Sequence, residues 1–144
     1  MDTLHLVLGV AVIATNLLAG VWGGVAWLQQ QPSVSFWYML RAAQATVVLQ
    51  VLVGGLLVLL GEEATGALHY VYGLAPLLVS LLAEAARAGA AERELGQVDF
   101  QTLPRDRQRL VALAIVRREM GIMAASALVI FFLALRAAGT STAF

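Results

Sequence analysis

The chain contains two histidines, His5 and His69, and each stands near the start of a long apolar stretch. A glycine follows each of them four residues later, as Gly9 and Gly73. Residues i and i+4 share one face of a helix, so each imidazole would have a notch without a side chain one turn deeper. Two neutral imidazoles from two helices suit the axial positions of a b-type haem, and the notches would admit the porphyrin. The pattern therefore predicts one haem b between His5 and His69.

Other interpretations of this pair stay open. A histidine at a helix end needs no ligand where water is near, and the His-xxx-Gly spacing is a weak pattern in a chain with 13 glycines. A bis-histidine metal site or a quinone site would use the same side chains, although two histidines are few ligands for copper. Haem propionates would need a cation, and Arg136 is the one that the sequence offers at this level. Because the chain has no cysteine, it holds no iron–sulfur cluster and no covalent c-type haem.

Composition indicates that these residues lie in a lipid bilayer. Of the 144 residues, 60% are hydrophobic and 12% are charged, whereas soluble domains are about 45–50% apolar and about 25% charged. This excludes a soluble enzyme. The chain also lacks a nucleotide-binding loop, a zinc-protease motif and a nucleophile elbow, so we do not expect an enzyme. Nine basic and nine acidic residues give no net charge, and nothing indicates a nucleic-acid partner.

Four apolar stretches are long enough to cross a membrane as helices. About 20 residues, at about 1.5 Å each, cross a hydrocarbon core of about 30 Å. Short connections favour a single all-α domain, an up-down-up-down four-helix bundle in the membrane. The third helix is expected to continue to Leu95 and stop near Gly96, and Pro104 favours the start of the fourth. The spans cover residues 4–28, 36–60, 67–87 and 110–136, with a polar linker at 96–104.

The arginine distribution predicts the orientation of the bundle. Eight of the nine arginines lie toward one side of the membrane, and Arg136 alone lies on the other. Because short cytoplasmic flanks are enriched in arginine and lysine, both termini are predicted to lie outside. The first and third spans then run parallel, which brings His5 and His69 to a similar depth near the outer face. The use of arginine without any lysine is typical of a GC-rich genome.

A second group of polar side chains gathers at the arginine-rich ends of the spans. Charges at that depth pair with one another or reach toward water, and we expect Arg41 to pair with Glu84 or Glu119. A basic pocket for an anionic lipid headgroup or for a partner protein is the functional alternative. Gln50, near the middle of the second span, is expected to bridge two helices. The predicted cluster contains Arg41, Gln44, Glu84, Arg87, Arg117, Arg118 and Glu119.

Small residues predict where the helices approach closely. Pairs of small residues four positions apart allow close helix packing in lipid, and we expect them to serve packing within the chain. Asn16, on the same helix face as His5, is expected to hydrogen-bond within the bundle, while Met120 and Met123 are expected to fill the core. The first span holds two such pairs, Ala19 with Gly23 and Gly20 with Gly24.

Residues 69–73 (His-Tyr-Val-Tyr-Gly) and 114–119 (Ala-Ile-Val-Arg-Arg-Glu) resemble segments of small four-span membrane proteins from GC-rich bacteria. This resemblance covers most of the chain. It implies a multi-pass protein of a bacterial inner membrane and no known activity. The pair of His5 and His69 also resembles the arrangement in four-helix b-type cytochromes, which implies haem binding. The chain has no second histidine pair for another haem, so electron transfer across the membrane is not implied. The competing function is a non-catalytic accessory or scaffold protein that binds a membrane protein partner or forms a homo-oligomer.

Overall fold

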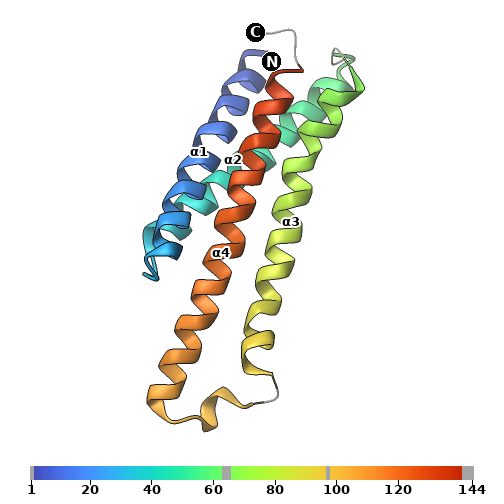
Figure 1. Cartoon of the computed structure of the whole chain (residues 1–144). Helices are drawn as coiled ribbons and strands as arrows, with labels where there is room; N and C mark the ends of the chain where they lie inside the picture. Colours follow the sequence, from blue (N-terminus) through green and yellow to red (C-terminus); the bar gives the residue numbers. More distant parts are fainter. Residues whose placement is uncertain (1, 63–65, 97, 141–144) are drawn as a thin grey trace.

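Four long helices make up nearly all of the described chain in this computed structural model (Figure 1). The structure describes residues 2–62, 66–96 and 98–140; Gln97, within the predicted linker, lies outside them. All four helices are long and apolar enough to cross a membrane, which confirms the predicted all-α bundle of an integral membrane protein. The elements are α1 (Asp2–Leu28), α2 (Val34–Leu59), α3 (Ala67–Leu95), the short 3-10 helix η1 (Phe100–Thr102) and α4 (Arg105–Ala138).

The helix boundaries follow local signals in the sequence. The side chain of Ser33 caps α2 by accepting a hydrogen bond of 3.2 Å from the backbone N–H of Phe36. Helix α3 continues to Leu95, as predicted, and ends at Gly96. The φ angle of Gly96 is 58°, in the left-handed region that glycine adopts without steric cost. Pro104 directly precedes α4, which confirms the predicted start of the fourth helix.

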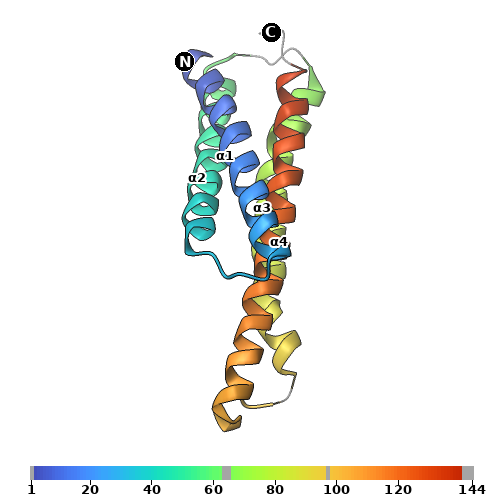
Figure 2. The ribbon, with the colours of Figure 1, turned by 60° about the vertical axis from the view of Figure 1, so that its left-hand side comes forward.

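Helix α4 organises the packing of the bundle. It packs along both α1 and α3, and α1 packs also along α2. Helices α2 and α3 have few contacts, and α1 lies diagonally across from α3. The start of α1, the end of α2, the start of α3 and the end of α4 lie at one end of the bundle, called here the terminal end (Figures 1 and 2). At the opposite end α3 and α4 extend beyond the α1–α2 loop. The segment that contains this extension, from Glu94 to Arg118, is called here the hairpin.

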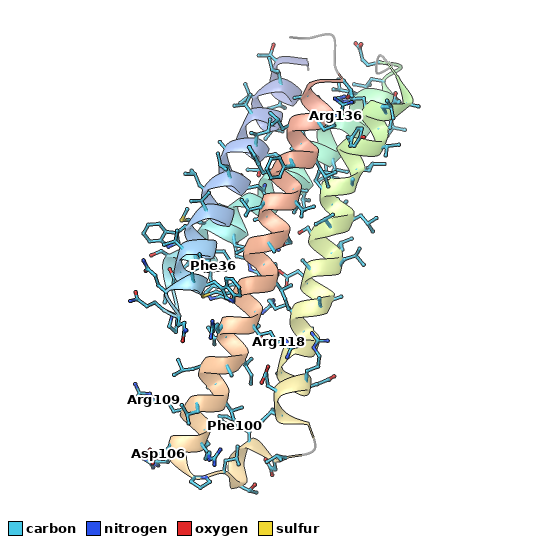
Figure 3. All side chains as sticks on the ribbon, viewed as in Figure 1. Phe36, Phe100, Asp106, Arg109, Arg118 and Arg136 are labelled. Carbon is cyan, nitrogen blue, oxygen red and sulfur yellow. The ribbon has the colours of Figure 1, made fainter. Side chains whose placement is uncertain are left out.

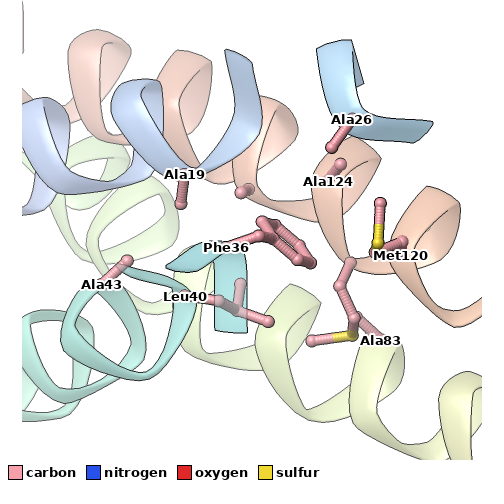
Figure 4. Packing of buried hydrophobic residues seen from close by; sticks show 10 residues of the cluster. Ala19, Ala26, Phe36, Leu40, Ala43, Ala83, Met120 and Ala124 are labelled. Atoms are coloured by element: carbon pink, nitrogen blue, oxygen red, sulfur yellow. The ribbon is translucent and has the colours of Figure 1, made fainter. Parts of the chain in front are cut away.

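The largest buried cluster lies near the α1–α2 loop (Figure 4). Phe36 is 0% exposed, and Met120 and Met123 are each 1% exposed, which confirms that the two methionines fill the core. A smaller cluster lies on the terminal side of this core, around Val47 and Ile130. Most leucines and valines of α1 and α2 are exposed on the outside of the bundle, as expected for helices that contact lipid.

Small residues of α1 let its neighbours approach closely. A Cβ atom at Gly23 would lie 2.3 Å from the ring of Phe36, and one at Gly20 would lie 2.7 Å from the side chain of Leu128. These glycines therefore serve packing within the chain, as predicted. Gly24 has no described atom within 4 Å of its Cβ position, so it takes no part in this packing, contrary to the prediction.

Candidate functional site

The two histidines lie next to each other at the terminal end. His5 is in the first turn of α1 and His69 is in the first turn of α3. Their ring centroids are 6.1 Å apart, and the ring planes are inclined by 53°. Helices α1 and α3 run in the same direction from this end, so equal distances from their starts bring the two imidazoles to the same depth. The tertiary structure thus brings together the two histidines that the sequence predicts as a ligand pair.

His69 is oriented by the end of α4. Its Nδ1 atom lies 3.3 Å from the backbone oxygen of Ala137. Because a carbonyl oxygen only accepts, Nδ1 carries the proton and Nε2 of the neutral ring keeps its lone pair. A backbone carbonyl commonly holds metal-binding histidines in this way. One turn along α3, Gly73 has no described atom within 4 Å of its Cβ position, so the predicted notch is open on this side.

His5 faces α2. Its Nε2 atom lies 3.2 Å from the amide nitrogen of Gln50, and a Cβ atom at Gly54 would lie 3.1 Å from its Cε1. The amide oxygen of Gln50 is buried and has no hydrogen-bond partner among the described residues. An amide nitrogen only donates, so Nε2 of His5 accepts this hydrogen bond with its lone pair. Gln50 therefore bridges α1 and α2, as predicted.

The second predicted notch is not open. A Cβ atom at Gly9 would lie 3.4 Å from the amide nitrogen of Gln50, so that side chain occupies the space beside Gly9. Asn16, deeper on the same face, is 2% exposed and donates a hydrogen bond of 2.9 Å to the carbonyl of Val12 in its own helix. The predicted bond of Asn16 is therefore made within α1 and not between helices.

Arg136 lies at the same end of the bundle as the histidines (Figure 3). Its guanidinium carbon is 5.9 Å from the centroid of the Tyr72 ring in α3. Tyr72 is one turn from His69, and Ala137 follows Arg136 directly, so this cation lies beside the α3–α4 contact that orients His69. Arg136 forms no salt bridge within residues 2–62, 66–96 and 98–140.

No family model matches this chain, and no curated protein or solved structure matches it either. The resemblances to four-span bacterial proteins and to b-type cytochromes therefore stay predictions. Within the described part of the chain, no group of three or more histidine, cysteine, aspartate or glutamate side chains is placed to hold a metal ion. A metal ion at His5 and His69 would thus take further ligands from elsewhere, as haem iron takes its equatorial ligands from the porphyrin.

A network of charged groups joins α2, α3 and α4 on the hairpin side of the core. The carboxylate of Glu84 accepts hydrogen bonds from Arg41 at 2.5 Å and from Arg87 at 2.9 Å. Gln44 donates a third hydrogen bond to it, at 2.8 Å. Arg87 also lies 3.6 Å from Glu119. The predicted pairing of Arg41 with Glu84 is present. Gln44 and Arg87, both predicted members of the cluster, also belong to this network.

The two consecutive arginines of α4 do not join this network. Arg118 pairs with Glu94 of α3 at 2.8 Å, within the hairpin. Arg117 lies over the ring of Trp27 in α1, with 5.9 Å between guanidinium carbon and ring centroid. Successive residues of a helix point in directions about 100° apart, so the two side chains reach different neighbouring helices. The predicted cluster is therefore divided among three places.

Proposed function

We propose that this integral membrane protein binds one b-type haem at its terminal end, with His5 and His69 as axial ligands. The observation that supports it most is the distance of 6.1 Å between the ring centroids. A metal–imidazole bond is about 2.0–2.1 Å long, so two imidazoles on opposite sides of one ion hold their donor atoms about 4 Å apart and their centroids about 6 Å apart. The observed centroid distance of 6.1 Å matches this value, and this match supports the proposal.

The surroundings of His69 suit an axial ligand. The carbonyl of Ala137 keeps the proton on Nδ1 and leaves Nε2 for iron. Gly73 leaves space beside the ring, and Arg136 offers a cation to a propionate. Bound haem supplies one-electron redox chemistry, which this chain would use in electron transfer or in haem handling.

The surroundings of His5 suit the proposal less well. Gln50 holds Nε2 and fills the notch at Gly9, so coordination through Nε2 requires Gln50 to give up this contact. A hydrogen bond of this kind contributes about 0.5–1.5 kcal/mol net, which makes Gln50 a weak competitor for the ring. The proposal therefore includes a specific role for Gln50, which is to occupy His5 when no haem is bound.

We also propose an orientation and a location for the protein. The arginines of the charged network and of the hairpin lie on one side, and Arg136 alone lies at the terminal end. Retention of arginine-rich flanks in the cytoplasm would place the hairpin inside and both termini outside. In the inner membrane of a bacterium, the haem would then lie near the outer face.

Removal of the ligands is expected to abolish haem binding. We expect absorption spectra of the detergent-purified protein to show a Soret band, with sharp α and β bands after reduction by dithionite. His5→Ala and His69→Ala are each expected to lose the sharp reduced bands, and the double variant is expected to lose the Soret band. Gln50→Ala keeps both ligands and removes the competitor, so its haem affinity is expected to equal or exceed that of the parent by up to about tenfold.

A steric pair of variants separates haem binding from an indirect effect of losing a histidine. Gly73→Leu fills the open space beside His69 and leaves both ligands in place, so it is expected to weaken haem binding. Gly55→Leu is the matched control, because Gly55 is equally open on α2, and its spectrum is expected to stay unchanged. A colourless protein from cells supplied with haem, unchanged by added haem, would contradict the proposal.

The hairpin favours a second candidate, a non-catalytic accessory or scaffold protein. Helices α3 and α4 extend beyond the rest of the bundle, and the Arg118–Glu94 ion pair joins them there (Figures 1 and 2). Such an extension offers a partner in a membrane complex a surface beyond the bilayer. A colourless protein that copurifies with one stoichiometric partner, and loses it when the hairpin is shortened, would favour this function over haem binding.

A further inference from the structure

A cavity of about 240 Å³ lies between the α1–α2 loop and α4. Gln30 and Gln31 line it on the loop side, and the apolar residues Leu110, Leu113 and Met120 line it on the α4 side. Arg117 is the one charged residue in the described lining. Neither the histidine pair nor the Glu84 network contributes to this cavity, so the sites discussed above do not account for it.

The cavity lies where the hydrocarbon core of the bilayer ends. At about 1.5 Å per residue, the 19 steps along α4 from Arg117 to Arg136 span about 28 Å, close to the core thickness of about 30 Å. Trp27 packs against Gly121, where a Cβ atom would lie 2.7 Å from its indole nitrogen, and its ring lies beneath Arg117. Tryptophan side chains concentrate at the level of the lipid headgroups. Arg117 therefore stands at headgroup depth.

The charge of Arg117 is open to an anion. Other arginines near this level are paired. Arg41 and Arg87 share the carboxylate of Glu84, and Arg118 forms a salt bridge with Glu94. Arg117 forms no salt bridge with any residue that the structure describes, and the ring of Trp27 leaves its charge in place. None of the described residues that line the cavity is acidic.

A second cation extends the positive surface away from the bilayer. Arg109 lies about two turns before Arg117 on α4 and is exposed. It projects from α4 away from α3, whereas Arg118 faces α3 (Figure 3). Arg109 and Arg117 thus form a positive surface on α4, and neither has a carboxylate partner among the described residues.

We propose that this cavity binds the headgroup of an anionic phospholipid, with its phosphate held by Arg117 and the amides of Gln30 and Gln31. A guanidinium group binds phosphate oxygens through two parallel hydrogen bonds. Pockets for drug-sized ligands are about 300–1,000 Å³, so this smaller cavity fits a glycerophosphate headgroup better than a protein segment. Acyl chains of the same lipid would lie against exposed apolar side chains of α1, such as Val25 and Leu28. Free phosphate shares the headgroup chemistry but lacks these chains.

Native mass spectrometry of the detergent-solubilised full chain tests this site. Phosphatidylglycerol and phosphatidylcholine with identical acyl chains are added separately, since both carry a phosphate and choline cancels its charge. We expect one phosphatidylglycerol to bind with a preference of about tenfold, and Arg117→Gln to remove most of that preference. Arg118→Gln is the matched control, because it deletes the same charge from the adjacent position, and it is expected to keep the preference.

Each further result decides between the lipid and another ligand. Equal binding of both lipids to the parent protein, or equal loss in the two arginine variants, overturns the proposal. Displacement of phosphatidylglycerol by millimolar inorganic phosphate assigns the site to free phosphate and also overturns it. Circular dichroism checks that the variants keep their helices. If Arg117→Gln does not fold, the loop variant Gln30→Ala, Gln31→Ala replaces it, with an expected loss of about threefold in the preference.

Discussion

The Glu84→Gln variant is expected to lose about 2–3 kcal/mol of unfolding free energy, because it leaves Arg41 and Arg87 without their shared carboxylate. Removing one partner of a buried ion pair costs about 3–5 kcal/mol, whereas exposed pairs contribute about 0–1 kcal/mol. The Glu84 side chain is 29% exposed and Arg41 is 51% exposed, which places the expected loss between these limits. Unfolding by denaturant in detergent micelles, followed by tryptophan fluorescence, measures it.

Two further variants separate the network from a general effect of charge. Glu92→Gln removes an exposed carboxylate from the same helix, outside every salt bridge of the described residues, and is expected to change stability by less than about 0.5 kcal/mol. Arg41→Gln is expected to lower the unfolding free energy by less than about 1 kcal/mol, since Arg87 still pairs with Glu84. If Glu84→Gln lowers the unfolding free energy no more than Glu92→Gln does, the network does not stabilise the bundle.

Replacing Gly23 with alanine is expected to lower the unfolding free energy by about 1–3 kcal/mol, the usual cost of overpacking a core. The added Cβ atom would lie 2.3 Å from the ring of Phe36, and that ring is fully buried and cannot turn aside without moving its neighbours. The same unfolding measurement in detergent micelles detects the loss.

Gly24→Ala is the matched control for this packing. It adds the same methyl group to the next residue of α1, where no described atom lies within 4 Å of the Cβ position. Alanine is the better helix former by about 0.8–1.0 kcal/mol, so Gly24→Ala is expected to leave stability unchanged or to raise it. Equal losses at the two positions would show that α1 does not depend on close contact with Phe36.

The membrane class, the number of spans and several helix ends could be read from the sequence because they depend on short-range properties. Uninterrupted apolar stretches set the spans, and Gly96 and Pro104 mark the boundaries of α3 and α4 through their own backbone preferences. The common depth of His5 and His69 was also predictable, since two parallel helices entering the membrane at the same side place their first turns at one level.

The direction in which side chains point was decided only by tertiary packing. Gly9 and Gly73 stand in the same local pattern, but Gln50 of α2 fills the space beside Gly9, and the space beside Gly73 stays open. Which face of α2 meets α1 depends on contacts such as Phe36 against Gly23, which bring together residues far apart in the sequence.

Arg117 and Arg118 of α4 show the same difference between what the sequence predicts and what tertiary packing decides. The sequence by itself determined that Arg117 and Arg118 lie near a membrane boundary, because they flank the last apolar stretch. The tertiary structure decided that Arg118 meets Glu94 of α3 and that Arg117 meets Trp27 of α1. A rotation of about 100° between consecutive helix residues separates side chains that are adjacent in sequence, and the neighbouring helix on each side then determines the partner.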